Sequence, residues 1–403
     1  MKNNASNNFL AKYILKKLTK DNVSYQAVLA EVPLSIHSLY KAFLNGLSIV
    51  RSREKSAYPV SLCLEASAKC NLKCPMCPRT DLLTRDTGNM DYGLYKTIID
   101  SVNPVFITLS QFGESLLHPR IIDMVSYARK KGRVVRLTTN ASLLSPELSQ
   151  KFIASGLSHL LISFDSCTKA LYEKLRLGAI FEKVVSNIKT LLKFKKELNS
   201  IYPIVGFNMT LNKDNIHEAA DMIKFCLAEF GIAPTFTKMY TYGEPARGGK
   251  SLGFSEVRHI KEAYDYARLH NLDALSMNLE TLYLDIISPI SGARPCFFPY
   301  YSTSVTWDGK VYPCCIYFDG QVTFGDLSKE SFRQVWNGSK YQEFRSRLRQ
   351  DREGMSLCRS CPLVDIGINN IIAKYRSISY FTNMISKRFF YYIRRDNGLK
   401  RAD

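Results

Sequence analysis

The stretch Glu65-Ala66-Ser67-Ala68-Lys69-Cys70-Asn71-Leu72-Lys73-Cys74-Pro75-Met76-Cys77-Pro78-Arg79 decides how the rest of this 403-residue chain is interpreted. Its three cysteines, separated by three residues and then by two, let one short loop hold three thiolates around an inorganic centre. A structural zinc site needs a fourth protein ligand, and the next ones in sequence, Cys63 and His118, stand at unfavourable spacings. A [4Fe-4S] cluster tolerates three protein thiolates when its last iron binds another group. The spacing therefore favours a cluster over zinc.

Further short motifs follow, each at or just beyond the end of an apolar run. Gly113-Glu114-Ser115 follows an expected strand, Thr138-Thr139-Asn140-Ala141 ends a second run, Leu161-Ile162-Ser163-Phe164-Asp165 ends another, and Arg176 lies in the next expected helix. With the cysteine loop, and in this order, they resemble the radical S-adenosylmethionine (SAM) enzymes. Serine at 115 replaces the usual proline of that family and alanine at 141 its usual glycine, so the match is close but not complete.

This resemblance implies a chemistry and a set of contacts. Cys70, Cys74 and Cys77 are expected to hold the cluster, whose vacant iron is chelated by the amino and carboxylate groups of SAM. Cleavage of SAM then gives a radical that removes hydrogen from a substrate. The residues expected to hold SAM are Glu114, Asn140, Ser163, Asp165 and Arg176. From the residues alone, Asn140 and Asp165 could equally cap the helices that follow them, and Arg176 could be a solvated helix charge.

The alternation of short β-branched runs with helical stretches predicts an α/β fold. Strands are expected at 60–65, 105–110, 134–138, 159–164, 204–210 and 234–238, with amphipathic helices between them. Parallel strands joined by helical crossovers predict a partial (β/α)6 barrel of the TIM-like, radical SAM type. Chemistry in such barrels lies at the carboxyl ends of the strands, where the motifs above also fall.

A second cysteine group predicts a separate metal centre near the end of the chain. Asp308-Gly309, between Val305 and Val311, is a strong β-hairpin signal. This region resembles the SPASM and shorter twitch domains that follow many radical SAM barrels. With five cysteines after residue 290, one auxiliary [4Fe-4S] cluster is expected. The expected ligands are Cys296, Cys314, Cys358 and Cys361, with Cys315 as the alternative to Cys314. A zinc ribbon with four cysteines remains the competing interpretation.

Composition adds the expected organisation and location. The predicted parts are a basic helical extension (1–56), the barrel (57–250), a helical linker (251–290), the auxiliary domain (291–365) and a basic aromatic tail (366–403). Eleven cysteines and no secretory segment favour the cytoplasm. The ends contribute to a net charge of +19; they are expected to pack on the barrel or to lie on the anionic inner membrane surface. No specific nucleic-acid partner is expected. Residues 243–249 are the expected loop at the barrel mouth.

Three classes of function are compatible with these features. The favoured one is an oxidoreductase acting on a small-molecule or glycan-like substrate, with the auxiliary cluster taking the second electron. The alternative is a peptide- or protein-modifying enzyme, and the third is a non-catalytic zinc-bound scaffold, which the intact cysteine loop and Glu114 oppose. The resemblance also implies an electron donor such as flavodoxin or ferredoxin. General bases and other catalytic side chains are left unassigned.

Overall fold

The computed structural model describes residues 54–240, 250–287, 298–317 and 322–359, together with single positions that include Cys296, Asp319 and Cys361. The expectations for residues 1–53, for the mouth loop at 243–249 and for the tail at 366–403 lie outside the described residues. In the part described, no helix is both long enough and apolar enough to cross a bilayer.

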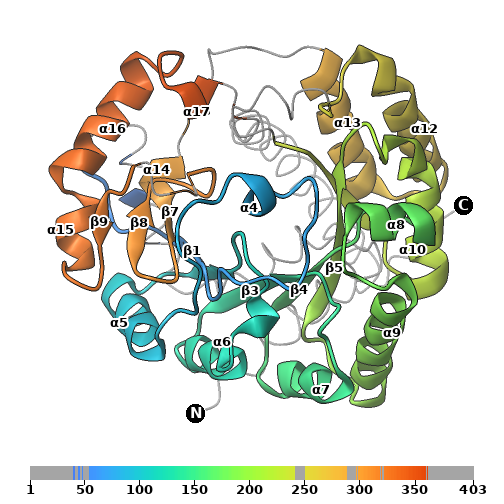
Figure 1. Cartoon of the computed structure of the whole chain (residues 1–403), viewed down its shortest axis with the longest axis horizontal. Helices are drawn as coiled ribbons and strands as arrows, with labels where there is room; N and C mark the ends of the chain where they lie inside the picture. Colours follow the sequence, from blue (N-terminus) through green and yellow to red (C-terminus); the bar gives the residue numbers. More distant parts are fainter. Residues whose placement is uncertain are drawn as a thin grey trace, which may run out of the picture.

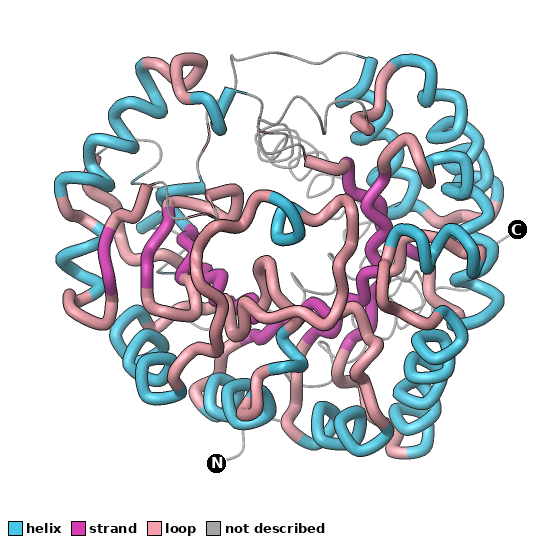
Figure 2. The backbone as a smooth tube through the Cα atoms, viewed as in Figure 1, coloured by secondary structure: helices cyan, strands magenta, loops and turns pink. Residues whose placement is uncertain are grey.

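One continuous sheet of nine strands organises the protein, in the order β6-β5-β4-β3-β2-β1-β7-β8-β9. The six predicted strands are confirmed and are parallel to their neighbours. Their bounds are β1 (Ser61–Leu64), β2 (Phe106–Leu109), β3 (Val134–Thr139), β4 (His159–Ser163), β5 (Ile204–Leu211) and β6 (Pro234–Lys238). The strands curve around an interior, as Figures 1 and 2 show, and form the expected unclosed barrel.

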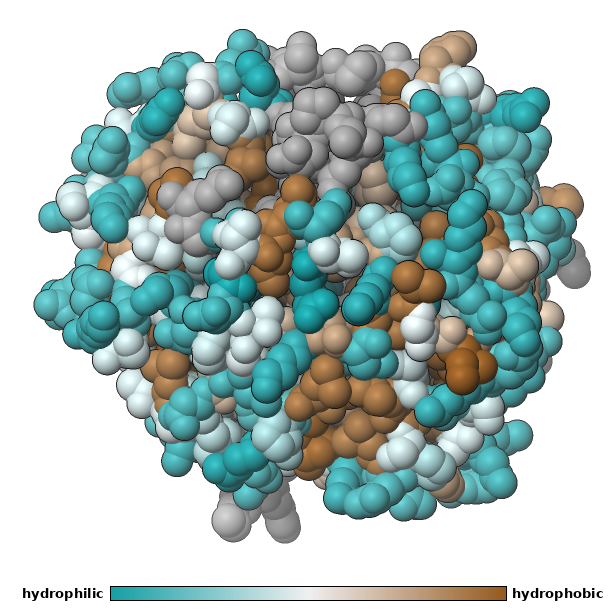
Figure 3. All heavy atoms as spheres, in the orientation of Figure 1, coloured by the Kyte–Doolittle hydropathy of each residue, from teal (hydrophilic) through white to brown (hydrophobic). Residues whose placement is uncertain are grey.

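Helices cover the outside of this curved sheet (Figure 1). They bury one apolar side each, as in α5, where Tyr95, Ile98, Ile99 and Val102 face the core. The rim in Figure 3 is mostly hydrophilic, because the other sides of these helices carry charged residues. The helices around the barrel are α4 (Pro78–Asp81), α5 (Tyr92–Val102), α6 (Ile121–Lys130), α7 (Pro146–Ala154), α8 (Lys169–Leu175), α9 (Phe181–Glu197), α10 (Ala219–Phe230), α12 (Val257–Leu269) and α13 (Asp273–Ile287).

The two faces of the barrel strands differ in chemistry. Burial alternates along β1 and β2, with Leu62, Leu64, Ile107 and Leu109 fully buried toward the helices. The residues between them keep partial exposure and are mostly polar or small, as period-two alternation in a strand requires. The interior face of the barrel is therefore the polar one.

The C-terminal domain extends the same sheet. Its first strand, β7 (Ser302–Val305), pairs in parallel with β1, and the predicted hairpin continues into β8 (Lys310–Tyr312) and then β9 (Gly325–Asp326). Gly309 occupies the turn with φ of +87°, a value that favours glycine. The remaining helices are α14 (Phe298–Tyr301), α15 (Phe332–Trp336), α16 (Ser339–Gln350) and α17 (Ser356–Arg359).

Packing at the far end of the sheet involves the segment expected to be a linker. Helix α13 lies along β6, where the side chain of Asn278 accepts a hydrogen bond from the Phe236 amide at 2.8 Å and donates one to the Phe236 carbonyl at 3.0 Å. These two bonds satisfy backbone groups of an edge strand that would otherwise be unpaired. The domain boundaries themselves stay predictions.

Candidate active site

The cysteine loop leaves the carboxyl end of β1 and brings its three thiols toward one another. Cys77 precedes the short helix α4, and its amide donates to the Cys74 carbonyl at 3.0 Å. Burial raises the pKa of all three thiols, and repulsion from neighbouring cysteines adds to the rise at Cys70 and at Cys77, whose pKa reaches about 11. Thiols that repel one another when ionised, in a buried loop, need a cation to stay ionised together. This donor set fits an iron–sulfur cluster.

Gly113 lets the loop after β2 dock directly on the base of the cysteine loop. A Cβ at this position would lie 1.9 Å from the Ser67 carbonyl oxygen, so no other residue fits without moving the backbone. The neighbouring amide of Glu114 donates to the Lys69 carbonyl at 2.7 Å. The glycine of the motif therefore has a structural reason in this chain: it permits a close backbone approach beside the first cysteine.

Glu114 is buried and tied to the end of β3. Its carboxylate accepts from Thr139 Oγ1 at 2.7 Å, from the Asn140 amide at 2.8 Å and from the Leu116 amide at 3.1 Å. Burial raises the pKa of Glu114, and these hydrogen bonds partly counter the effect. A carboxylate has about four acceptor sites, so one remains for a further donor such as an ammonium group.

Asn140 and Ser163 stand at the ends of neighbouring strands. The Asn140 side chain accepts from the Ser142 amide at 2.9 Å and donates to Asn71, in the cysteine loop, at 3.2 Å. It does not cap the next helix, because Ser145 does so. Ser163 ends β4 opposite Asn208 of β5 and is half-buried. Both residues therefore lie where the sequence places them, beside the mouth of the barrel.

Asp165 and Arg176 form a buried ion pair beside the cysteine loop, a pairing that the sequence did not indicate. The Asp165 side chain is fully buried and that of Arg176 is 14% exposed, so Arg176 is not a solvated helix charge. Burial alone would lower the pKa of Arg176, but the negative charges of Asp165 and Cys74 outweigh it and raise the pKa. Asp165 also accepts from the Thr210 amide at 2.7 Å. The pair thus brings a positive charge close to Cys74.

The auxiliary cysteines line a cavity in the C-terminal domain. Cys296, Cys314, Cys358 and Cys361 share its wall, whereas Cys315 does not. Burial raises the pKa of Cys296 to about 11 and that of Cys314 further, with repulsion from the neighbouring cysteines adding to both. This arrangement favours Cys314 over Cys315 as the fourth ligand. Among the described residues, no three His, Cys, Asp or Glu side chains are grouped to hold a single metal ion.

The hairpin turn of the C-terminal domain packs against residues 86–88, in the segment that follows the cysteine loop. Trp307 donates from Nε1 to the Asp86 carbonyl at 3.1 Å and from its amide to Glu65 at 3.3 Å. The same Glu65 carboxylate, fully buried at the end of β1, pairs with Arg85 at 2.6 Å. Gly88 lies against the indole ring of Trp307. These contacts hold the hairpin turn of the C-terminal domain against the segment that follows the cysteine loop.

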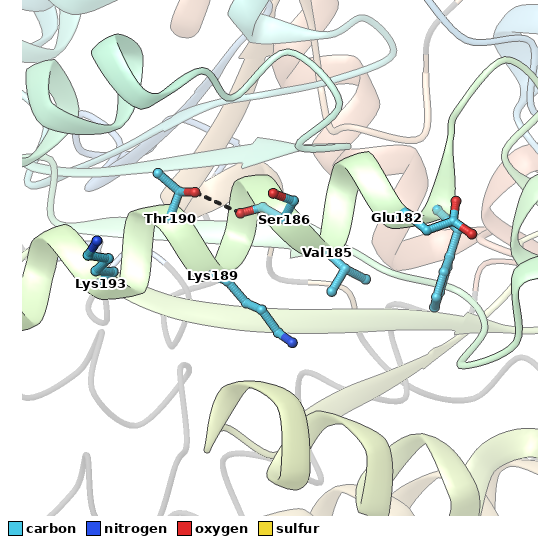
Figure 4. A pocket seen from close by; sticks show the side chains of 7 residues that line it. Glu182, Val185, Ser186, Lys189, Thr190 and Lys193 are labelled. Atoms are coloured by element: carbon cyan, nitrogen blue, oxygen red, sulfur yellow. Dashed lines mark hydrogen bonds between the residues drawn. The ribbon is translucent and has the colours of Figure 1, made fainter.

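A second hollow lies outside the barrel, along α9, and is drawn in Figure 4. All its described lining residues come from this one helix, including Val185, Lys189 and Lys193. One helix does not enclose a ligand, and none of the candidate residues above lines this hollow. We assign it no part in the site.

Two family models match the chain. The model described as "Radical SAM superfamily" matches residues 64–226, and the model described as "Iron-sulfur cluster-binding domain", SPASM, matches residues 296–362. The chain is therefore a radical SAM protein with a C-terminal SPASM domain. A [4Fe-4S] cluster and SAM are the cofactors of the first domain, and auxiliary iron–sulfur ligation belongs to the second.

The names of similar proteins differ in what they say those proteins act on. The chain is 25% identical over 308 residues to the "Tungsten-containing aldehyde ferredoxin oxidoreductase cofactor-modifying protein" of Pyrococcus furiosus, covering 70% of this chain and 82% of the relative. It is 23% identical over 290 residues to the "PqqA peptide cyclase" of Gluconobacter oxydans, covering 69% and 76%. The structure of Streptococcus suis SuiB bound to precursor peptide SuiA has a TM-score of 0.58 at 16% identity, covering 80% of this chain and 75% of that one. At that identity, the likeness to SuiB concerns the fold.

Proposed function

We propose that this protein is a radical SAM oxidoreductase that removes hydrogen from a small-molecule or glycan-like substrate and passes the second electron to one auxiliary [4Fe-4S] cluster. The observation that carries the proposal is the convergence of three thiols, one buried and two half-buried, with Glu114 and the Asp165–Arg176 pair at one end of the barrel. In radical SAM proteins the bound cluster supplies an electron to SAM, which splits into methionine and a 5′-deoxyadenosyl radical.

Individual residues have distinct parts in this proposal. Cys70, Cys74 and Cys77 would hold the cluster. Glu114, with one acceptor site left, would receive the SAM ammonium group. The Nε of Arg176 is buried and donates no hydrogen bond within the described residues, so it would bind the SAM carboxylate. Asn140 and Ser163, at adjacent strand ends, would contact the rest of SAM. Burial of these groups would keep water from the radical.

The C-terminal cavity supports the second part of the proposal. Cys296, Cys314, Cys358 and Cys361 would supply four thiolates, one for each iron of the auxiliary cluster. A cluster with no free iron accepts or relays electrons more readily than it binds substrate directly. The proposed role is therefore to oxidise the substrate radical. The expected electron donor for the first cluster is a flavodoxin or ferredoxin, and the proposed location is the cytoplasm.

Iron and product analysis tests the function. Anaerobically reconstituted protein should hold about eight irons, and the Cys70→Ala/Cys74→Ala/Cys77→Ala variant about four. Reduced protein with SAM should form 5′-deoxyadenosine, and the triple variant none. Cys226→Ala, a buried cysteine in α10 that is not among the candidate ligands, is the control and should behave as wild type. Cluster-loaded wild type that does not cleave SAM would refute the proposal.

Peptide modification is the second candidate function, and the likeness to a peptide cyclase favours it. The two candidates differ in the substrate that couples 5′-deoxyadenosine formation to turnover. Cell extract can be separated by size and each fraction treated with protease before the assay. Stimulation that survives protease supports the small-molecule or glycan substrate, whereas stimulation that protease abolishes supports the peptide.

A further inference from the structure

A row of polar residues crosses the interior face of the barrel at one level. In the register of the sheet, Cys63 of β1 is opposite Ser304 of β7 and Thr108 of β2, Thr108 is opposite Arg136 of β3, and Arg136 is opposite His159 of β4. Paired residues of parallel strands point to the same face. That face is opposite to the one on which the leucines of β1 pack against the helices. The row therefore faces the inside of the barrel.

Arg136 has no partner for its charge in the described residues. It is half-buried, its Nε is fully enclosed, and it forms neither a hydrogen bond nor an ion pair with any described side chain or carbonyl. Arginine carries five N–H donors, and buried donors in native proteins are nearly always satisfied. The other buried guanidinium groups of the sites above do have partners: Arg176 pairs with Asp165 and Arg85 with Glu65. Arg136 is thus a binding group for which the described residues supply no ligand.

The sheet order relates Arg136 to both cysteine sites. Arg136 is on β3, two strands from β1, whose carboxyl end leads into the cysteine loop. It is three strands from β7, which begins the hairpin that leads to Cys314. The interior at the level of Arg136 therefore belongs to the same curved sheet from which both cysteine sites extend.

SAM itself does not account for this arginine. Arg136 precedes Asn140, at the mouth, by four residues, which places it about 13 Å deeper at the spacing of an extended strand. The SAM carboxylate must stay next to the iron held by the loop that leaves the mouth. A group at the level of Arg136 belongs instead to a molecule deeper in the barrel.

We propose that Arg136 binds an oxyanion of the substrate, a carboxylate or a phosphate group, inside the barrel and deeper than SAM. This inference rests on the proposed function, because it names the substrate class of that site. The planar guanidinium matches either oxyanion with two parallel hydrogen bonds. Thr108, on the neighbouring strand, supplies a hydroxyl at the same level.

Magnetic resonance of small probe anions tests the proposal without knowledge of the substrate. Inorganic phosphate, followed by phosphorus NMR, and malonate, followed by proton NMR, are added separately to the anaerobic, cluster-loaded protein without SAM. Reduction makes the clusters paramagnetic, so an anion near Arg136 relaxes faster. Variants are Arg136→Gln, Arg136→Lys and Arg268→Gln, an exposed arginine on α12 that controls for binding to the basic surface. Iron content confirms that every variant is folded and loaded.

Wild type and Arg268→Gln should show the same relaxation enhancement. The enhancement for Arg136→Gln should be about five-fold smaller, because the bidentate contact is gone. Arg136→Lys should lose less, since it keeps the charge but not the fork of donors. The probe with the larger effect distinguishes phosphate from carboxylate. Equal enhancement in wild type and Arg136→Gln, or none in wild type, would overturn the inference. Absence of 5′-deoxyadenosine in wild type would instead refute the proposed function and leave the anion result standing by itself.

Discussion

Replacing Gly88 by alanine should destabilise the contact between the hairpin turn and the cysteine loop. A Cβ at Gly88 would lie 2.4, 2.5 and 2.7 Å from three atoms of the Trp307 ring. The ring is not free to swing away, because its Nε1 donates to the Asp86 carbonyl at 3.1 Å. Either this hydrogen bond breaks or the backbone moves by about 1 Å, and overpacking of this kind costs about 1–3 kcal/mol of unfolding free energy.

A double-mutant cycle with Trp307→Ala isolates this clash. Urea unfolding of the anaerobic protein should show that Gly88→Ala costs about 2 kcal/mol in wild type and less than about 0.5 kcal/mol when the indole is absent. Gly132→Ala is the matched control: its φ is +75° and nothing lies within 4 Å of the added Cβ. It should cost about 1 kcal/mol in both backgrounds, because only backbone strain is involved. An equal cost of Gly88→Ala in both backgrounds would refute the reasoning.

Three further outcomes are expected. Cys314→Ala should lose about four irons and Cys315→Ala none, measured by iron analysis; the reverse result would exchange their roles. Arg176→Gln should lower the free energy of unfolding by about 3 kcal/mol, because it leaves the buried Asp165 carboxylate unpaired, and Asp165→Asn/Arg176→Gln should recover part of that loss in urea titrations. Partial burial raises the pKa of Asp326, but hydrogen bonds from a lysine and a serine outweigh it and hold the pKa at about 2. The stability that this carboxylate contributes is therefore complete above its unfolded pKa of about 4 and disappears as the pH falls toward 2. Asp326→Asn should consequently flatten the pH dependence of the unfolding midpoint in that interval, and an unchanged profile would contradict the assignment.

Much of the barrel could be predicted from the sequence because its strands are apolar runs bounded by recognisable turns. The hairpin was equally visible, since Asp308-Gly309 leaves few conformations to choose from. The pairing of β7 with β1 was not predicted: Ser302–Val305 contains three hydroxyl residues, yet all four of its residues are buried between β1 and β8. No local pattern marks the pairing of a polar strand with a parallel partner, β1, that lies more than two hundred residues away.

In the candidate site, too, the sequence predicted individual residues but not their contacts with distant partners. The motifs placed Glu114 and Asp165 near one mouth, but not their partners. Glu114 binds the end of β3, and Asp165 pairs with Arg176 from beyond opposite ends of helix α8, so the contacts depend on tertiary geometry. Arg136 carries no motif at all. Its significance appears only when the register shows that it faces inward and that the described residues offer its charge no counterion.

The parallel pairing of β7 with β1 joins the barrel and the C-terminal domain in one sheet and so fixes the distance between the two cysteine sites. Both cysteine sites are attached to strands of one hydrogen-bonded sheet, so their separation is set by the fixed spacing of neighbouring strands, about 4.8 Å each, and not by a hinge. A substrate that must reach both sites therefore has to span a distance that does not change. Under the proposed function, a substrate that contacts both SAM at the mouth and Arg136 must match this fixed geometry.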